Sequence, residues 1–197
     1  GKYRSMLIGV EELDAPEADP FDICIIGAGA AGLSLARNLD RRAFRICLLE
    51  SGRPNPSREA QSLNDADCIG LDYDLAESRC RALGGTLHTW QGTIAPLDPI
   101  DFEARDWISH SGWPLSTEVM RAAYDDAYSV LGVGDVASRF DGFDAQERSA
   151  IQKFGAPLDI FEPKPFIILK QHLEGLCRRL RRDVVERDNV LCVTNAT

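Results

Sequence analysis

A glycine triplet between two apolar runs constrains the fold of this chain more than any other feature. The run before the triplet, residues 22–27 (DICIIG), is short and rich in isoleucine, which predicts a strand buried on both faces. Residues 30–40 predict a helix, and the run at 44–50 (FRICLLE) predicts a second buried strand. Because a parallel strand pair needs such a crossover, the sequence predicts a β-α-β unit. The apolar face of its helix is expected at Ala31, Leu35 and Leu39.

The three glycines have the order G-x-G-x-x-G, and each has a separate predicted role. Gly27 allows the tight turn after the strand, Gly29 lets the backbone approach a pyrophosphate, and Gly32 lets the helix pack close to the strand. The free N–H groups at the helix start, at Ala30 and Ala31, then face the phosphate. The pattern therefore predicts a dinucleotide site.

Glu50 closes the second apolar run, where a carboxylate can accept a hydrogen bond from a ribose hydroxyl. The same carboxylate disfavours a 2′-phosphate, so NADP is the least expected occupant. The glycine motif by itself does not decide whether the cofactor is NAD or FAD.

Several further motifs follow in a fixed order. LLESG lies at 48–52, LGGT follows an arginine, and the blocks PLDPIDFEARDW and GWPLSTEVMRAAYDDAYSVLGV come after them. Together they resemble the glucose-methanol-choline family of FAD-dependent oxidoreductases, in particular its bacterial sugar-oxidising relatives. The resemblance covers most of residues 20–135 and returns weakly at 169–197. Besides the glycine triplet and Glu50, the residues that this resemblance places at the cofactor are Ser51, Arg81, Gly84, Gly85, Thr86, His88 and Trp90.

The resemblance implies an α/β fold, namely a Rossmann-like FAD-binding domain of the glucose-methanol-choline type that is incomplete in this chain. FAD is longer than NAD, and a side chain at Gly84 or Gly85 would keep backbone amides away from the flavin or its phosphates. By resemblance, these two glycines and Thr86 line the ribityl and flavin end of the cofactor.

His88 bears on how FAD is held. In some relatives a histidine directly before the tryptophan is bonded covalently to the flavin, whereas here Thr89 occupies that position. A shift of one residue re-aims a loop side chain, so FAD is expected to bind non-covalently. His88 is then either part of the flavin loop wall or an ordinary hydrogen-bonded loop histidine.

The implied reaction is the oxidation of a CH–OH group of a sugar, glycoside or other alcohol to a carbonyl, with hydride transfer to flavin N5. Oxygen, a quinone or another acceptor then reoxidises the flavin. The catalytic base of the resembling family lies far toward the C-terminus, and His110 and His172 lack its context. No catalytic residue is therefore expected in this chain, and its C-terminal remainder is an expected partner.

The chain is expected to divide into four parts. These are an N-terminal extension (1–19), the FAD-binding unit with the flavin loop (20–135), a loop-rich connection or start of a substrate domain (136–168), and a helix and strand that return to the FAD domain (169–197). The last part predicts a helix over 169–182, followed by a strand.

Two helices and a loop are expected between residues 101 and 160. Residues 101–108 predict a short helix capped by Asp98 or Asp101. Residues 117–131 predict a core-facing helix, and 132–160 a loop with a brief helical piece. The stripe expected to face the core consists of Val119, Ala123, Ala127, Val130 and Leu131.

Composition excludes some classes of function. The net charge is −9, with 31 acidic residues against 22 lysines and arginines, which argues against nucleic-acid binding. The arginine-rich stretch 177–182 is expected to be the solvated face of a helix. No apolar run is long enough to predict a membrane span.

The six cysteines contain no C-x-x-C pair, so neither a metal site nor a redox dithiol is predicted. They are expected to be free thiols of a cytoplasmic protein, with Cys24, Cys47 and Cys192 buried as small apolar residues. Two alternatives stay open: an NAD-binding dehydrogenase domain, and a non-catalytic flavoprotein fragment.

Overall fold

The computed structural model describes residues 7–13, 20–134, 140, 142–153, 155, 157–158, 160–169 and 173–197, without the side chains of 173 and 174. Predictions that concern the remaining positions, His172 among them, lie outside the described residues. The chain forms two compact units. The first comprises Gly1–Gln91 and Gln171–Thr197, and the second comprises Gly92–Lys170. Each unit is described by itself.

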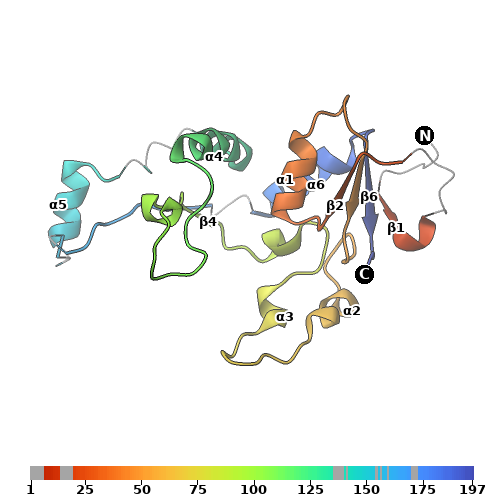
Figure 1. The fold of residues 1–197 in the computed structure, drawn as a ribbon, viewed down its shortest axis with the longest axis horizontal. Helices are drawn as coiled ribbons and strands as arrows, with labels where there is room; N and C mark the ends of the chain where they lie inside the picture. The colour runs from red at the N-terminus through yellow and green to blue at the C-terminus, as the bar shows by residue number, and fades with distance from the viewer. Residues whose placement is uncertain are drawn as a thin grey trace. The chain divides into compact units, whose positions relative to one another are not determined.

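The first unit is built on a parallel sheet with the strand order β1-β6-β3-β2. The strands are β1 (Leu7–Gly9), β2 (Ile23–Ile26), β3 (Ile46–Leu49) and β6 (Val190–Thr194). The last strand of the chain thus lies between the first and the third (Figure 1). The α/β Rossmann-like fold and the β-α-β unit predicted from the sequence are confirmed, whereas β1 was not predicted because a strand of three residues leaves almost no periodicity.

Burial across the sheet differs from the prediction for the first apolar run. All of β6 is buried, but in β2 only Ile25 is buried, Cys24 is exposed and Ile26 is 86% exposed. The prediction that β2 is buried on both faces was therefore wrong. The reason is its place at the edge of this sheet, where one face alone is covered: Ile25 packs beneath Gly32 of the following helix.

Helices α1 (Ala30–Asn38) and α6 (Leu173–Val185) lie side by side against the sheet (Figure 1). The predicted apolar face of α1 was wrong, because Leu33 and Ala36 are buried while Ala31 is exposed and Leu35 is 51% exposed. The close contact at Gly32 turns the neighbouring Leu33 toward the sheet and Leu35 away from it.

The helix predicted over 169–182 begins at Leu173 instead, and its expected apolar positions Leu176 and Leu180 are buried. Arg187, just beyond α6, donates hydrogen bonds to the carbonyl oxygens of Ala36, Arg37 and Leu39 at the end of α1. These bonds satisfy carbonyl groups that a helix end leaves unpaired, and they tie the C-terminal segment to the first crossover helix.

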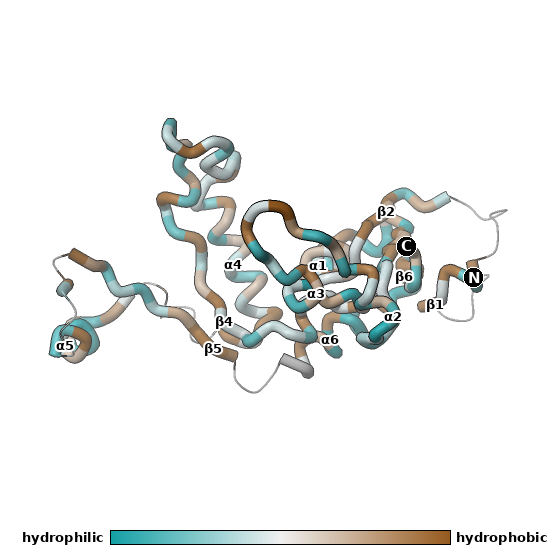
Figure 2. Tube along the Cα trace, turned by 90° about the horizontal axis from the view of Figure 1, so that it is seen from below, coloured by the Kyte–Doolittle hydropathy of each residue, from teal (hydrophilic) through white to brown (hydrophobic). Residues whose placement is uncertain are grey.

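Short helices connect the strands of this unit: η1 (Val10–Glu12), α2 (Arg58–Gln61), η2 (Ser62–Asn64), α3 (Leu75–Ser78) and η3 (Gly85–His88). The loop before α3 carries exposed Ile69 and Leu71. Figure 2 draws the hydrophobic positions of the chain in brown.

The second unit pairs β4 (Thr93–Ile94) with β5 (Ile167–Ile168) in an antiparallel ladder. Its helices are η4 (Pro99–Phe102), α4 (Thr117–Leu131) and α5 (Ala145–Lys153). The brief helical piece predicted within the loop is confirmed by α5. The helix predicted over 101–108 is instead the 3₁₀ turn η4, which ends at Phe102. Asp98 is its N-cap residue, and the Asp98 N–H donates to Asp101 Oδ2 at 2.8 Å.

Helix α4 has the predicted bounds, but the prediction that it faces a core was wrong. None of its side chains is buried, and Val119 is 58% exposed. Its half-buried side includes Met120, Tyr124 and Tyr128, which line a hollow with the segment that contains η4. The two-residue strands of this unit provide too little sheet to cover an amphipathic helix.

Candidate cofactor site

The glycine loop between β2 and α1 has the geometry of a phosphate loop. Gly27 has a φ of +96°, a value that favours glycine, and its N–H donates to the Leu49 carbonyl at 2.8 Å. A Cβ on Gly32 would lie 1.9 Å from the Gly27 carbonyl oxygen, so only glycine allows α1 to approach the strand this closely. A Cβ on Gly29 would meet no atom within 4 Å. The space beside Gly29 is therefore not filled by the protein, and a ligand can occupy it.

The start of α1 offers unused hydrogen-bond donors beside this room. The first helical bond runs from the Leu33 N–H to the Gly29 carbonyl, so the N–H groups of Ala30 and Ala31 have no partner within the helix. The cap residue Gly29 provides no side-chain cap, and the first turn contains no acidic residue. Free N–H groups and the positive end of the helix dipole favour an anion there.

Glu50 is buried at the carboxyl end of β3 and links two loops. Its Oε2 accepts from the Ala28 N–H at 2.9 Å, and its Oε1 accepts from the Gly52 N–H at 2.8 Å. Each carboxylate oxygen keeps a further lone pair, so a ribose contact at Glu50 is compatible with these bonds. The structure adds a role that the sequence did not predict, because Glu50 holds the phosphate loop against the end of β3.

Arg81 braces the segment that follows β3. Its Nη1 donates to Ser51 Oγ at 2.7 Å, and its Nε donates to Asn64 Oδ1 at 3.1 Å. A Cβ on Gly52 would lie 2.3 Å from the Arg81 carbonyl carbon, which explains the glycine at the end of LLESG. The structure therefore brings Ser51 and Arg81 together, and their contact with the cofactor stays a prediction.

Asn64 and Gln61 were missed by sequence reasoning. Gln61 accepts from the Arg81 N–H and donates to the Ala76 and Arg79 carbonyl oxygens, while Asn64 Nδ2 is buried without a partner among the described residues. Both residues lie in a short helical segment that has no motif, so no sequence signal marked them.

The second glycine pair seats its loop on the phosphate loop. The Gly84 N–H donates to the Ala28 carbonyl at 2.8 Å, and a Cβ on Gly85 would lie 3.0 Å from Gly29 Cα. Gly84 has a φ of +109°, and a Cβ there would lie 2.6 Å from Cys177 Sγ. Packing within the protein therefore requires glycine at both positions, in addition to the space that the cofactor was expected to need. As a result, the η3 loop lies beside the place where a phosphate would bind.

His88 in this loop faces the protein. Its Nε2 lies 3.0 Å from the Leu83 carbonyl oxygen and 3.8 Å from Cys177 Sγ. Because a carbonyl oxygen only accepts, Nε2 carries the proton and donates it to Leu83. This matches the hydrogen-bonded alternative for His88. Within the same loop, Thr86 is exposed and Trp90 is half-buried, and the Trp90 N–H donates to the Thr86 carbonyl.

The six cysteines are free, but only part of their expected burial holds. Cys177 and Cys192 are buried, Cys47 is half-buried, and Cys24 is exposed because it lies on the uncovered face of β2. Burial, with Glu50 and Cys47 nearby, raises the pKa of the Cys192 thiol to about 12. Burial also raises the pKa of Cys177, while Arg181 beside it acts in the opposite direction. Within the described part of the chain, no cluster of three or more His, Cys, Asp and Glu residues could hold a metal.

The parallel sheet, the glycine loop and the buried acid at the end of β3 define a Rossmann-like dinucleotide-binding fold. The family model described as FAD dependent oxidoreductase matches residues 22–181, so the chain belongs to this family. No curated protein matches the chain. FAD is therefore the cofactor, bound non-covalently as is typical of the family, and the NAD-binding alternative was wrong. Among the described helices, none is both long and apolar enough to cross a bilayer.

Proposed function

We propose that this protein oxidises a CH–OH group of a sugar, glycoside or other alcohol to a carbonyl, in the manner of the glucose-methanol-choline family. In this proposal the chain supplies the FAD-binding part. The observation that carries it is the seating of LGGT on the phosphate loop through the Gly84 N–H and the close approach of Gly85 to Gly29. That second glycine turn is one of the motifs that carry the resemblance.

The residues of the chain divide the work of holding FAD. Gly27, Gly29 and the first N–H groups of α1 would hold the pyrophosphate, and Glu50 a ribose hydroxyl. The loop with Thr86 would line the flavin end. When bound, FAD supplies the electron acceptor for the hydride of the alcohol carbon.

The proton of the alcohol must go to a base. His88 Nε2 already carries a proton that it donates to Leu83, so it cannot accept another at this atom. His110 lies in a loop of the second unit, where no described contact marks it as a base. We propose that the base, like most of the substrate wall, comes from a C-terminal remainder, and that oxygen, a quinone or another acceptor takes up the electrons in a reducing, cytoplasmic setting.

Anaerobic bleaching of the absorbance of oxidised flavin tests the reaction class. The full protein is mixed with a panel of sugars, glycosides, simple alcohols and, as a contrasting class, primary amines. Bleaching by sugars or alcohols alone supports the proposal. Bleaching by amines alone overturns it, and FAD retention without bleaching by any donor indicates the non-catalytic alternative.

A further inference from the structure

Two adjoining hollows border α6 on the side that faces the segment after β3. One has a volume of about 420 Å³ and the other about 470 Å³. Asn55, Arg178 and Arg181 line both of them, and His88, Thr89 and Trp90 line the second. We call these two hollows together the arginine cleft. Its size is in the range of small-molecule sites, about 300–1,000 Å³.

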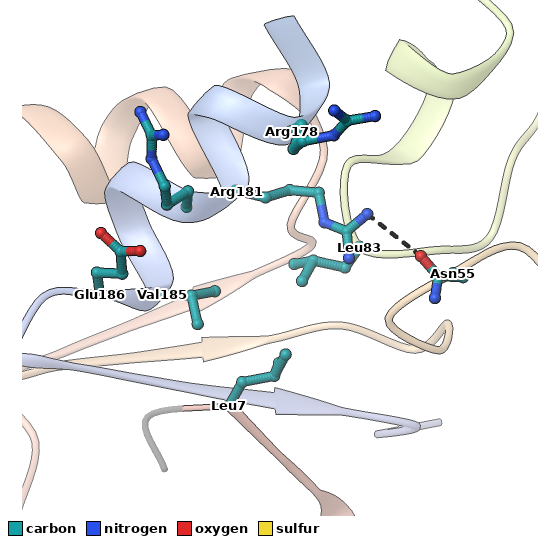
Figure 3. Close-up of a pocket in the computed structure, with 8 residues that line it drawn as sticks. Leu7, Asn55, Leu83, Arg178, Arg181, Val185 and Glu186 are labelled. Atoms are coloured by element: carbon teal, nitrogen blue, oxygen red, sulfur yellow. Dashed lines mark hydrogen bonds between the residues drawn. The ribbon is translucent and has the colours of Figure 1, made fainter. Parts of the chain in front are cut away.

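The charge in the arginine cleft is opposite to that of the chain. Arg178 and Arg181 are three positions apart on α6, and Figure 3 shows the Arg181 side chain extending past Leu83 to Asn55, with the Arg178 side chain above it in this view. Arg181 Nη1 donates to Asn55 Oδ1 at 3.5 Å, a long bond to a neutral group. Arg182 and Glu186 line the first hollow only, and Arg182 contacts Asp183. Among the described residues, no carboxylate lines the second hollow.

This placement is unusual for a chain with a net charge of −9. Other arginines of the same unit face carboxylates: Arg37 pairs with Asp183, Arg41 with Asp188, and Arg53 with Glu59. Two guanidinium groups that converge on a hollow with a neutral amide and a hydroxyl form a donor-rich wall, which suits an oxyanion.

The arginine cleft is separate from the phosphate loop of the cofactor site, although His88 and Trp90, which the resemblance places at the cofactor, also line its second hollow. Its lining contains neither the glycine loop nor Glu50. The two glycines of η3 face different neighbours, because Gly85 approaches Gly29 while Gly84 approaches Cys177 of α6. The cleft lies on the Cys177 side, since Cys177 and His88 line it.

We propose that the arginine cleft binds the phosphate group of a small phosphorylated molecule other than FAD. A phosphate offers oxygens to both guanidinium groups, and its double charge matches their two positive charges. Asn55 and Thr89 add neutral hydrogen-bonding groups. Leu87 and Trp90 supply apolar surface for the organic part of the ligand. This inference does not depend on the CH–OH reaction proposed above.

Calorimetric titration of the FAD-saturated protein tests the proposal, with inorganic phosphate and pyrophosphate as probes and acetate as a carboxylate at equal ionic strength. Saturating FAD keeps the probes out of the phosphate loop. We expect saturable binding of phosphate or pyrophosphate, weaker binding of acetate, and a loss of affinity of about tenfold or more in Arg181→Gln and in Arg178→Gln. Arg179→Gln is the matched control, because it removes the same charge from the same helix outside the cleft.

Each other outcome overturns the proposal. Absence of saturable binding means that the arginines do not form a site. Equal weakening by Arg179→Gln means that the attraction is diffuse. Binding of acetate as tight as that of phosphate contradicts the phosphate assignment. Binding of a probe that is seen only in FAD-free protein places the probe in the cofactor site. The Gly29→Val variant gives a second check, because it should lose FAD and still bind pyrophosphate in the cleft.

Discussion

Gly29 and Gly32 stand three residues apart in one motif, yet substitution should affect different properties of the protein. A Cβ on Gly29 meets no atom within 4 Å, whereas a Cβ on Gly32 would lie 1.9 Å from the Gly27 carbonyl oxygen. We therefore expect Gly29→Val to abolish FAD retention while the protein still folds, because its side chain fills the space for the pyrophosphate. We expect Gly32→Ala to destabilise the protein itself, because α1 must move away from the strand.

The structure gives rough magnitudes for the two changes. Gly29 is the N-cap of α1 with an extended backbone (φ −76°, ψ −169°) that valine can adopt, so the free energy of unfolding should fall by about 1 kcal/mol or less. The overlap at Gly32 is with backbone atoms, which cannot rotate away. The free energy of unfolding should therefore fall by about 1–3 kcal/mol or more, the range typical of overpacking. For a chain of this length, about 1 kcal/mol corresponds to roughly 2–4 °C in Tm.

The assay has two independent readouts. Urea unfolding of the FAD-free proteins gives the free energy of unfolding, and flavin absorbance after gel filtration gives cofactor retention. Gly134→Val serves as a control, since Gly134 is an open glycine of the second unit. Normal FAD retention by Gly29→Val would refute the phosphate assignment. A Gly32→Ala protein as stable as the wild type would refute the packing argument.

Three further predictions concern Glu50, the cofactor linkage and the buried thiols. Glu50→Ala leaves the Ala28 and Gly52 N–H groups without their partner, so urea unfolding should show a loss of about 1–3 kcal/mol, and FAD affinity should fall as well. Acid or heat should release FAD from the denatured protein, because His88 Nε2 is occupied by Leu83; flavin absorbance that stays with the precipitate would contradict this. The Cys192 pKa is raised from 9.0 to about 12, so its proton is held more tightly in the folded state. The stability that this contributes is fully present below pH 9 and is lost as pH rises toward 12. Over that window, the urea midpoint of Cys192→Ala should therefore fall less steeply than the urea midpoint of the wild type.

Controls separate local from general effects in two of these cases, Glu50 and Cys192. For Glu50, the exposed Glu11→Ala should leave both stability and FAD binding unchanged. For Cys192, the exposed Cys68→Ala should show the wild-type pH dependence. An identical alkaline slope in wild type and Cys192→Ala would mean that other groups cause the loss.

The sequence by itself determined the local features of the nucleotide fold. A strand, a glycine turn, a helix and a second strand depend on residue patterns within a span of about thirty residues, which single-chain periodicity can detect. The bounds of α4 and the roles of Gly27 and Gly32 follow for the same reason: each depends on backbone geometry that the local sequence encodes.

Only the tertiary structure decided which surfaces are covered. Cys24 and Ile26 are exposed because their face of β2 is uncovered among the described residues, and α1 buries Leu33 instead of Leu35 because Gly32 sets its rotation. The hydrophobicity of a side chain predicts that it can be buried, but the residues that cover it belong to segments distant in sequence. β6 joins the sheet beside β3, although more than a hundred residues separate them along the chain. The second role of Glu50 and the convergence of Arg178 and Arg181 with Asn55 arise from this long-range assembly, which no local pattern records.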